Sequence, residues 1–319
     1  MESDRSGHRV PGAGVEAHRR SGRPVLGPLV LAVGGTGEST PGDDPASVTG
    51  MLARVTDELD ERFSARWVPY PASYGPAASL DGECYLSSVA RGVTALAQAI
   101  DDAVAEQPDR PVMLIGYSQG AVVIRSLLAR PATGRYAASV AGLGFVADPH
   151  QPPGAVPGCD GWGVAGRGPD LPAEIPAFWV GAPDDVICNA SPDSLIRDVA
   201  DLSGMFSVDQ VRTWLADVYT RVRDAELQNA ARTRLAPSQW IRDVRRLAIA
   251  AREVRGYLPS SLRVHRWRWD NPLGGRHVSY GTEPYLRAPL TAPDVTGCQV
   301  LAQWMQVQAT LGPHQRCAA

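Results

Sequence analysis

A serine between two glycines is the first feature of the chain that points to chemistry. Residues 116–120 read Gly-Tyr-Ser-Gln-Gly, directly after the apolar run 112–115 and directly before a helical pattern over 121–128. A strand, a sharp turn and a helix in this order expose a serine hydroxyl for nucleophilic attack. The bare pattern also occurs in ordinary glycine-rich turns, but its position here favours Ser118 as a nucleophile.

A serine hydroxyl attacks well only when a histidine takes its proton and a carboxylate orients that histidine. In α/β-hydrolases the acid and then the histidine follow the serine along the chain. Asp185 follows the second strand pattern after Ser118, the usual place for the acid in this fold, and is favoured. Asp148 follows the first strand pattern after Ser118 and is the second candidate, although beside Pro149 it also suits a structural role in a turn or cap. Asp184 is the third candidate.

The histidine must come after the acid and before the end of the fold. Of six histidines, four are excluded by their positions, namely His8, His18, His150 and His314. His265 lies inside an alternating strand pattern, where a structural role is expected. His277 lies in the loop 274–281, just past that pattern, and is the predicted base.

Two backbone N–H groups should stabilise the negative charge that develops on the substrate oxygen. Gln119 follows the nucleophile and supplies one, so we expect substitution of its side chain to have little effect. The glycine-rich loop 33–38 should supply the other, and Thr36 could add its hydroxyl. A phosphate-binding loop is the weaker interpretation, because no lysine follows the glycines.

Short apolar runs alternate with helical patterns along the first part of the chain. Such alternation predicts a parallel sheet with helices on both faces. The predicted strands are 29–33, 67–70, 112–115, 140–146 and 178–180, with covering helices around 89–100 and after Ser118.

We predict a flexible leader over 1–26 and one catalytic domain over 27–319, with a helical insertion at 191–260. The first insertion helix should begin at Ser191 as N-cap and bury Leu195, Ile196, Val199 and Leu202. A second should bury Val211 to Val222, and a third should bury Ile241, Val244 and Leu247 and end at Gly256. A strand at 262–269 and a last helix at 300–307 should follow.

The composition of the 319 residues is that of an ordinary globular protein, with 44% hydrophobic and 20% charged residues and a net charge of -3. We therefore expect no nucleic acid partner and, for want of a long apolar run, no transmembrane segment. We see no export signal and expect synthesis in the cytoplasm. The five cysteines lack metal-ligand spacing, so reduced thiols are favoured over disulfides and no cofactor or metal is expected.

Several segments together resemble a known group. The motifs at 34–38, 70–75 and 116–121 are similar to those of the cutinase-like serine esterases, and residues 185–188, Asp-Val-Ile-Cys, resemble their acid loop. The helical insertion followed by His-Val-Ser-Tyr at 277–280 most resembles phage lysin B. The resemblance spans about 27–310 and implies the α/β-hydrolase fold with Ser118, Asp185 and His277 as nucleophile, acid and base.

The resemblance to lysin B implies hydrolysis of the ester between mycolic acids and arabinogalactan, at the envelope of a phage-infected host. Two features depart from these groups. Gly181 stands where secreted cutinases have the cysteine that closes the acid loop, and the leader is too short for a peptidoglycan-binding domain. The alternatives are a bacterial cutinase-like lipase or carboxylesterase with the same triad, and a non-catalytic α/β binding protein.

Overall fold

The computed structural model describes residues 27–75, 82–130, 136, 138–204, 220, 228, 240–264, 266–286, 288 and 290–316. The predicted leader, His265 and most of 205–239, including nearly all of the second insertion helix, lie outside the described residues. The predicted domain boundaries stay a prediction.

Five parallel strands form the central sheet, in the order β2-β1-β3-β4-β5. The three central strands are almost wholly apolar and buried, as expected of a parallel sheet that is covered on both faces. The strands are β1 (Leu29–Val33), β2 (Ser64–Trp67), β3 (Val112–Tyr117), β4 (Val140–Val146) and β5 (Ala177–Val180).

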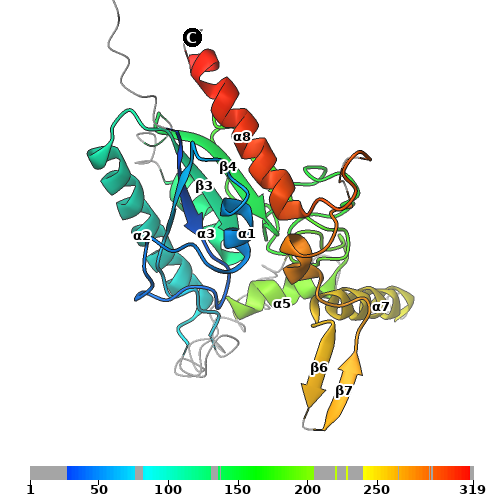
Figure 1. Ribbon diagram of the computed structural model, residues 1–319. Coiled ribbons are helices and arrows are strands. Elements are labelled where there is room, and N and C mark those ends of the chain that lie inside the picture. The colour runs from blue at the N-terminus through cyan, green and yellow to red at the C-terminus, as the bar shows by residue number, and fades with distance from the viewer. Residues whose placement is uncertain are drawn as a thin grey trace, which may run out of the picture.

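Helices cover both faces of this sheet (Figure 1). α2 (Tyr85–Glu106) and α3 (Gln119–Leu128) pack on one face, where Leu31 and Leu114 join their apolar side chains in one core cluster. α1 (Gly50–Thr56) and α8 (Gly297–Arg316) pack on the other, around Ala32 and Ile115. The predicted α/β-hydrolase architecture is confirmed.

The edge strand β2 begins and ends earlier than the sequence predicts. It covers Ser64–Trp67 rather than 67–70, because Ser64 to Arg66 pair with β1 although none of their side chains is fully buried. An edge strand needs no continuous apolar run, so its first residues carry no hydrophobic signal.

The single strand predicted over 262–269 is wrong. The structure has two short antiparallel strands there, β6 (Ser261–Val264) and β7 (Trp267–Asp270), which form a hairpin separate from the central sheet. Alternating side chains are compatible with one long strand or two short ones, and no Gly or Asn marks the turn.

Two described helices lie between the acid and the histidine, α5 (Leu195–Ser203) and α7 (Trp240–Tyr257). Ser194, not Ser191, caps α5, since its side chain accepts the Ile196 N–H. Gly256 lies inside α7 and does not end it.

The buried faces of these helices also differ from the prediction. The side chains of Val199, Ile241, Val244 and Leu247 are exposed. Those of Arg197, Arg246 and Glu253 are buried instead. Their charged groups bond to nearby polar groups: Arg197 donates to four backbone carbonyls, those of Trp162, Gly163, Ala190 and Ser191. A prediction from hydrophobic periodicity assumes that charged side chains face solvent, so it cannot identify charged side chains that are buried by hydrogen bonding.

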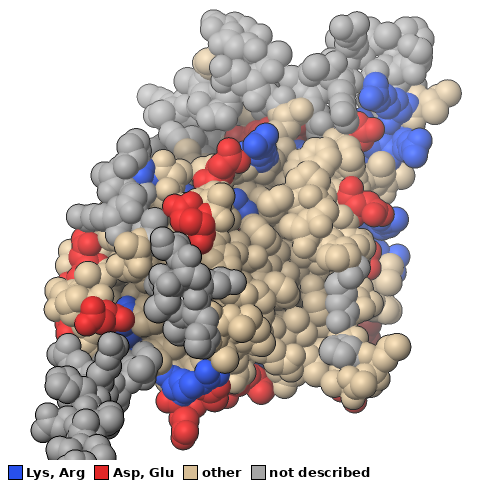
Figure 2. Space-filling model, turned by 90° about the horizontal axis from the view of Figure 1, so that it is seen from above, with Lys and Arg blue, Asp and Glu red and all other residues tan. Residues whose placement is uncertain are grey.

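The histidine segment and the C-terminal helix complete the fold. The 3-10 helix η5 (Arg276–Gly281) follows the hairpin, and α8 extends well beyond the predicted 300–307. None of the helices in the described part of the chain is long and apolar enough to cross a bilayer. On the face seen from above, charges of both signs are interspersed among uncharged side chains (Figure 2).

Candidate active site

Ser118 occupies a sharp turn between β3 and α3. Its backbone has φ 51° and ψ -114°, a conformation that costs free energy for a residue with a Cβ. The Ser118 N–H donates to the Val146 carbonyl at 2.9 Å, which ties the turn to β4. The turn therefore holds the serine at the carboxyl end of the sheet.

The two glycines of the motif permit this turn by their lack of a side chain. A Cβ on Gly116 would lie 2.7 Å from the Ala121 nitrogen, and one on Gly120 would lie 1.9 Å from the Val33 oxygen. Both are closer than nonbonded atoms can approach. The glycines thus allow α3 to begin directly against β1 and β3.

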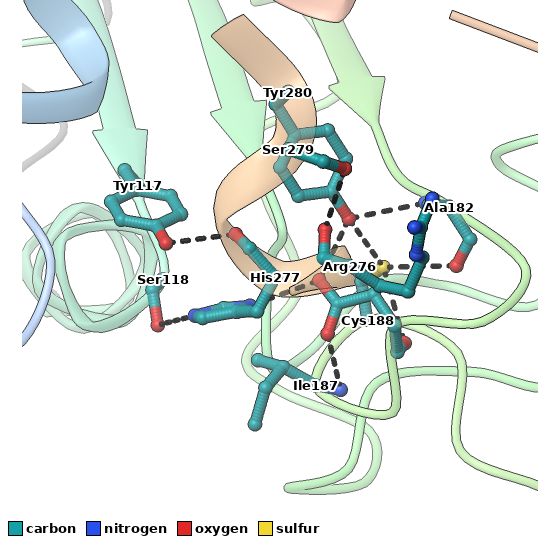
Figure 3. Close-up of polar contacts among 10 residues, drawn as sticks. Tyr117, Ser118, Ala182, Ile187, Cys188, Arg276, His277, Ser279 and Tyr280 are labelled. Carbon is teal, nitrogen blue, oxygen red and sulfur yellow. Dashed lines mark hydrogen bonds and ion pairs between the residues drawn. The ribbon is translucent and has the colours of Figure 1, made fainter. Parts of the chain in front are cut away.

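The structure brings the three predicted residues together in one hydrogen-bonded line, of which Figure 3 labels Ser118 and His277. The Ser118 Oγ lies 3.0 Å from Nε2 of His277, and Nδ1 of that ring lies 2.9 Å from Oδ2 of Asp185. These residues come from the ends of β3 and β5 and from η5, separated by up to 159 positions. With Nδ1 donating to the carboxylate, Nε2 is left to accept the serine proton.

Asp185 is fully buried, and several donors hold its charge. Oδ2 accepts the Tyr280 hydroxyl at 2.7 Å and Oδ1 accepts the Ile187 N–H at 3.0 Å. Burial alone raises the pKa of Asp185, but the charge and hydrogen bond of His277, together with the Tyr280 and Ile187 bonds, hold the pKa below its ordinary value. The carboxylate is therefore charged at neutral pH.

The other acid candidates lie apart from this line. The buried Asp148 carboxylate accepts the Arg125 Nε at 2.8 Å, the Trp179 Nε1 at 3.0 Å and the His150 N–H at 2.9 Å. Asp184 is exposed. Asp148 thus has a structural role, in agreement with the turn interpretation.

Two tyrosine rings enclose the His277 imidazole. The Tyr117 ring stacks at 5.2 Å between centroids and the Tyr257 ring lies at 5.6 Å, tilted by 42°. The Tyr117 hydroxyl also donates to the His277 carbonyl at 2.8 Å. These contacts fix the ring plane between Ser118 and Asp185.

Part of the chain that carries this site is similar to proteins of known families. Residues 62–186 match the PE-PPE domain. The matched segment includes Ser118 and Asp185 but ends before His277.

Two curated relatives are esterases by name. The carboxylesterase Culp6 homolog of Corynebacterium glutamicum is 30% identical over an alignment of 137 residues, which covers 39% of this chain and 44% of the relative. Acetylxylan esterase 2 of Talaromyces purpureogenus is 38% identical over 83 residues, 26% of this chain and 33% of the relative. The chain spans less than half the length of either relative.

Two solved structures are similar to the chain at low sequence identity. Lysin B from mycobacteriophage D29 is 16% identical with a TM-score of 0.45, over 88% of this chain and 99% of that one. The catalytic core of an acetyl xylan esterase from Trichoderma reesei is 21% identical with a TM-score of 0.40, over 61% and 98%.

The loop after β1 faces Ser118, as the sequence predicts, but Thr36 does not present a free hydroxyl. The Thr36 Oγ1 donates to Oε1 of Gln119 at 3.2 Å. As the first residue of α3, Gln119 has a backbone N–H without an intrahelical acceptor. The Thr36 hydroxyl proton is therefore engaged by the Gln119 side chain, and an oxyanion site formed by backbone N–H groups of this loop and of Gln119 stays a prediction.

Sequence reasoning missed the side chains that hold this loop in place. The Gln119 amide connects Thr36 to the Ser73 carbonyl, to which its Nε2 donates at 3.0 Å. Glu38 accepts the N–H groups of Gly35 at 2.9 Å and Met51 at 2.8 Å. Burial raises the pKa of Glu38 above its ordinary value, and the two N–H groups offset only part of that rise. No local pattern signals contacts between such distant residues.

Tyr280 was also missed as a partner of the acid, although one signal was present. It lies three residues after His277, and in a 3-10 helix residues at this spacing point the same way. Its hydroxyl contacts Asp185, accepts the Ala182 N–H at 3.1 Å and lies 3.4 Å from Sγ of Cys188.

Among the described residues, four cysteines are reduced and outside any disulfide: Cys84, Cys159, Cys188 and Cys298. Cys188 packs under the acid loop next to Gly181, and burial raises the pKa of its thiol well above the ordinary value. Its thiol is therefore unreactive. Within the described ranges, no group of three or more His, Cys, Asp or Glu side chains is placed to hold a metal ion.

Proposed function

We propose that the protein is a serine esterase, a carboxylic ester hydrolase that acts through a covalent acyl-serine intermediate. The observation that carries this proposal is the line from Ser118 Oγ through the His277 ring to the Asp185 carboxylate, with contacts of 3.0 and 2.9 Å. The similarity of residues 62–186 to the PE-PPE domain and the curated esterase relatives support it.

In the proposed mechanism each of these residues takes part in a defined step. The Ser118 oxygen attacks the ester carbonyl while its proton passes to Nε2 of His277. The buried Asp185 carboxylate stabilises the imidazolium, and the N–H groups of Thr36 and Gln119 receive the negative oxygen. His277 then protonates the departing alcohol oxygen. Water, deprotonated by the same ring, attacks the acyl-serine, and the acid leaves as Ser118 regains its proton.

The intermediate can be trapped. When the protein is quenched in acid during hydrolysis of a short nitrophenyl ester, the mass of the intact protein should rise by that of one acyl group. After digestion, the acyl group should be found on the peptide that contains Ser118. Ser118→Ala should show neither the added mass nor hydrolysis. An adduct on another residue would refute the assignment.

For the substrate, we propose the ester bond between mycolic acids and arabinogalactan, cleaved at the envelope of mycolic-acid bacteria during phage-induced lysis. The motifs that resemble lysin B support this choice, as does the helical region between Asp185 and His277. Exposed apolar side chains close to His277, among them Val278, suit a lipid ester.

Mass analysis of products tests the substrate. Wild-type protein added to purified mycolyl-arabinogalactan should release free mycolic acids, and Ser118→Ala should release none. Release of acids from short nitrophenyl esters alone would favour the second candidate, a cutinase-like lipase or carboxylesterase on lipid or soluble esters. The carboxylesterase and acetylxylan esterase relatives support that candidate.

A further inference from the structure

The β6–β7 hairpin projects from the molecule beside η5 (Figure 1). All four residues of β7 are exposed, and Trp267 and Trp269 leave 72% and 48% of their surface open to solvent. Since side chains alternate along a strand, both indole rings lie on one face of the hairpin. Two exposed tryptophans side by side are unusual on a soluble surface and indicate a contact site.

The charge of the hairpin is opposite to that of the whole chain. Residues 261–270 contain Arg263, Arg266 and Arg268 against one acid, Asp270, whereas the full chain has a net charge of -3. Arg268 forms an ion pair with Asp270 at 2.7 Å, and the Arg266 guanidinium lies 6.0 Å from the centre of the Trp267 ring. Tryptophan beside arginine is the composition that favours a lipid interface with anionic headgroups.

Hydrogen bonds fix the base of the hairpin to the elements around His277. The Asn271 N–H donates to the Ser260 carbonyl at 2.7 Å, and its side chain donates to the Arg255 carbonyl at 2.7 Å. The Gly275 N–H, directly before η5, donates to the Leu258 carbonyl at 2.7 Å. The hairpin is thus held in a fixed position relative to the catalytic histidine segment.

Exposed apolar side chains also continue from the hairpin toward that segment. Leu273 and Val278 leave 54% and 60% of their surface exposed, and Val278 directly follows His277. Exposed apolar side chains therefore lie on β7, on the segment that joins it to η5, and on η5 itself.

We propose that the hairpin is an interfacial anchor: Trp267 and Trp269 insert into a lipid surface while the neighbouring arginines contact its anionic headgroups, which places the mouth of the Ser118 site against that surface. The location of the anchor follows from the structure, and its purpose rests on the proposed esterase function. Lipid esters would then reach Ser118 without leaving the interface.

Vesicle sedimentation with the full chain tests the anchor separately from catalysis. We expect binding to vesicles of phosphatidylcholine and phosphatidylglycerol in equal parts, weaker binding to phosphatidylcholine alone, and loss of the difference in high salt. Ser118→Ala should bind as the wild type does, since binding needs no hydrolysis. Failure of the esterase proposal would therefore leave this result intact.

Variants locate the contact. Trp267→Ala and Trp269→Ala should each bind roughly tenfold more weakly, and Arg266→Gln roughly fivefold more weakly on the anionic vesicles only. Leu311→Ala, which removes an exposed apolar side chain near the distant end of α8, is the matched control and should bind normally. A far-UV circular dichroism spectrum and a thermal midpoint equal to those of the wild type show that each hairpin variant is folded.

Three results with vesicles would overturn the proposal. These are wild-type vesicle binding by a Trp267→Ala/Trp269→Ala double variant, an equal loss in Leu311→Ala, and equal binding to neutral and anionic vesicles. Binding to arabinogalactan without binding to vesicles would assign the tryptophans to a glycan and equally contradict a lipid anchor.

Discussion

Tyr280 helps to keep the Asp185 carboxyl ionised although it does not contact Ser118. Its hydroxyl shares Oδ2 of Asp185 with the His277 ring and donates to it at 2.7 Å. A hydrogen bond to a charged group is worth about 1.5–3 kcal/mol. Tyr280 is therefore a positioning residue, and its effect should depend on the ionisation of Asp185.

Tyr280→Phe keeps the ring but removes the bond that helps to lower the pKa of Asp185. Because that pKa lies below its unfolded value of 3.8, the ionised carboxylate stabilises the fold above about pH 4, and this stability is lost as pH falls through the folded pKa. Urea unfolding should show Tyr280→Phe less stable by about 2 kcal/mol at pH 7. The difference should shrink at lower pH as the carboxyl is protonated.

Tyr285→Phe is the matched control for this measurement. Its hydroxyl donates to the Gly181 carbonyl at 3.2 Å, a group that does not titrate. Protonation of Asp185 should therefore leave the stability loss of Tyr285→Phe unchanged between pH 7 and pH 3. A pH-independent loss in Tyr280→Phe would show that the Asp185 contact is unimportant.

The Gln119 side chain gives a second prediction at this scale. Gln119→Met keeps the chain length but loses the amide that connects Thr36 to the Ser73 carbonyl. Misplacement of the loop that carries the Thr36 N–H should lower kcat roughly tenfold, equivalent to about 1.4 kcal/mol. Steady-state hydrolysis of a short ester measures it. Wild-type kcat would support the sequence-based expectation that only the backbone of Gln119 matters.

At the scale of elements, the close contact of α3 with β1 and β3 sets the position of the nucleophile. Gly120 touches the Val33 carbonyl at a distance that admits no Cβ, so β1 and the start of α3 must separate if one is added. The strained backbone of Ser118 lies between these elements and depends on their packing.

Gly120→Ala should therefore destabilise the fold by about 3 kcal/mol, the upper range for overpacking. Gly42→Ala is the control, because a Cβ there meets no atom within 4 Å. Thermal unfolding should show a lower midpoint for Gly120→Ala and almost none of that change for Gly42→Ala. Equal midpoints for the two variants would contradict the packing described for the turn.

At the scale of the whole molecule, what could be predicted depended on whether the signal was local. The runs 29–33 and 140–146 are strands as predicted, because parallel strands buried on both faces are apolar throughout. The order of the strands along the chain then favoured Asp185 as the acid, and its position in the loop after the last strand pattern favoured His277 over His265. The contacts of Gln119, Glu38 and Tyr280 depend on loops that meet only in the folded chain.

The region between the acid and the histidine was predicted least well. Arg197 and Arg246 are buried because backbone carbonyls and Asp198 receive their guanidinium groups, which hydropathy cannot reveal. The exposed Trp267 and Trp269 were expected in a single strand and instead lie on a projecting hairpin. Tertiary contacts thus bury two arginines that would usually face solvent, and the lack of such contacts leaves two tryptophans exposed that would usually be buried.

The central claim is that His277 activates Ser118 as a nucleophile in this fold. A fluorophosphonate probe should label the folded protein once, on the peptide that contains Ser118. Ser118→Ala should take no label, and His277→Ala should label at least about a hundredfold more slowly because the general base is lost. Unchanged labelling in Ser118→Ala, or no labelling of the folded wild type, would contradict the account.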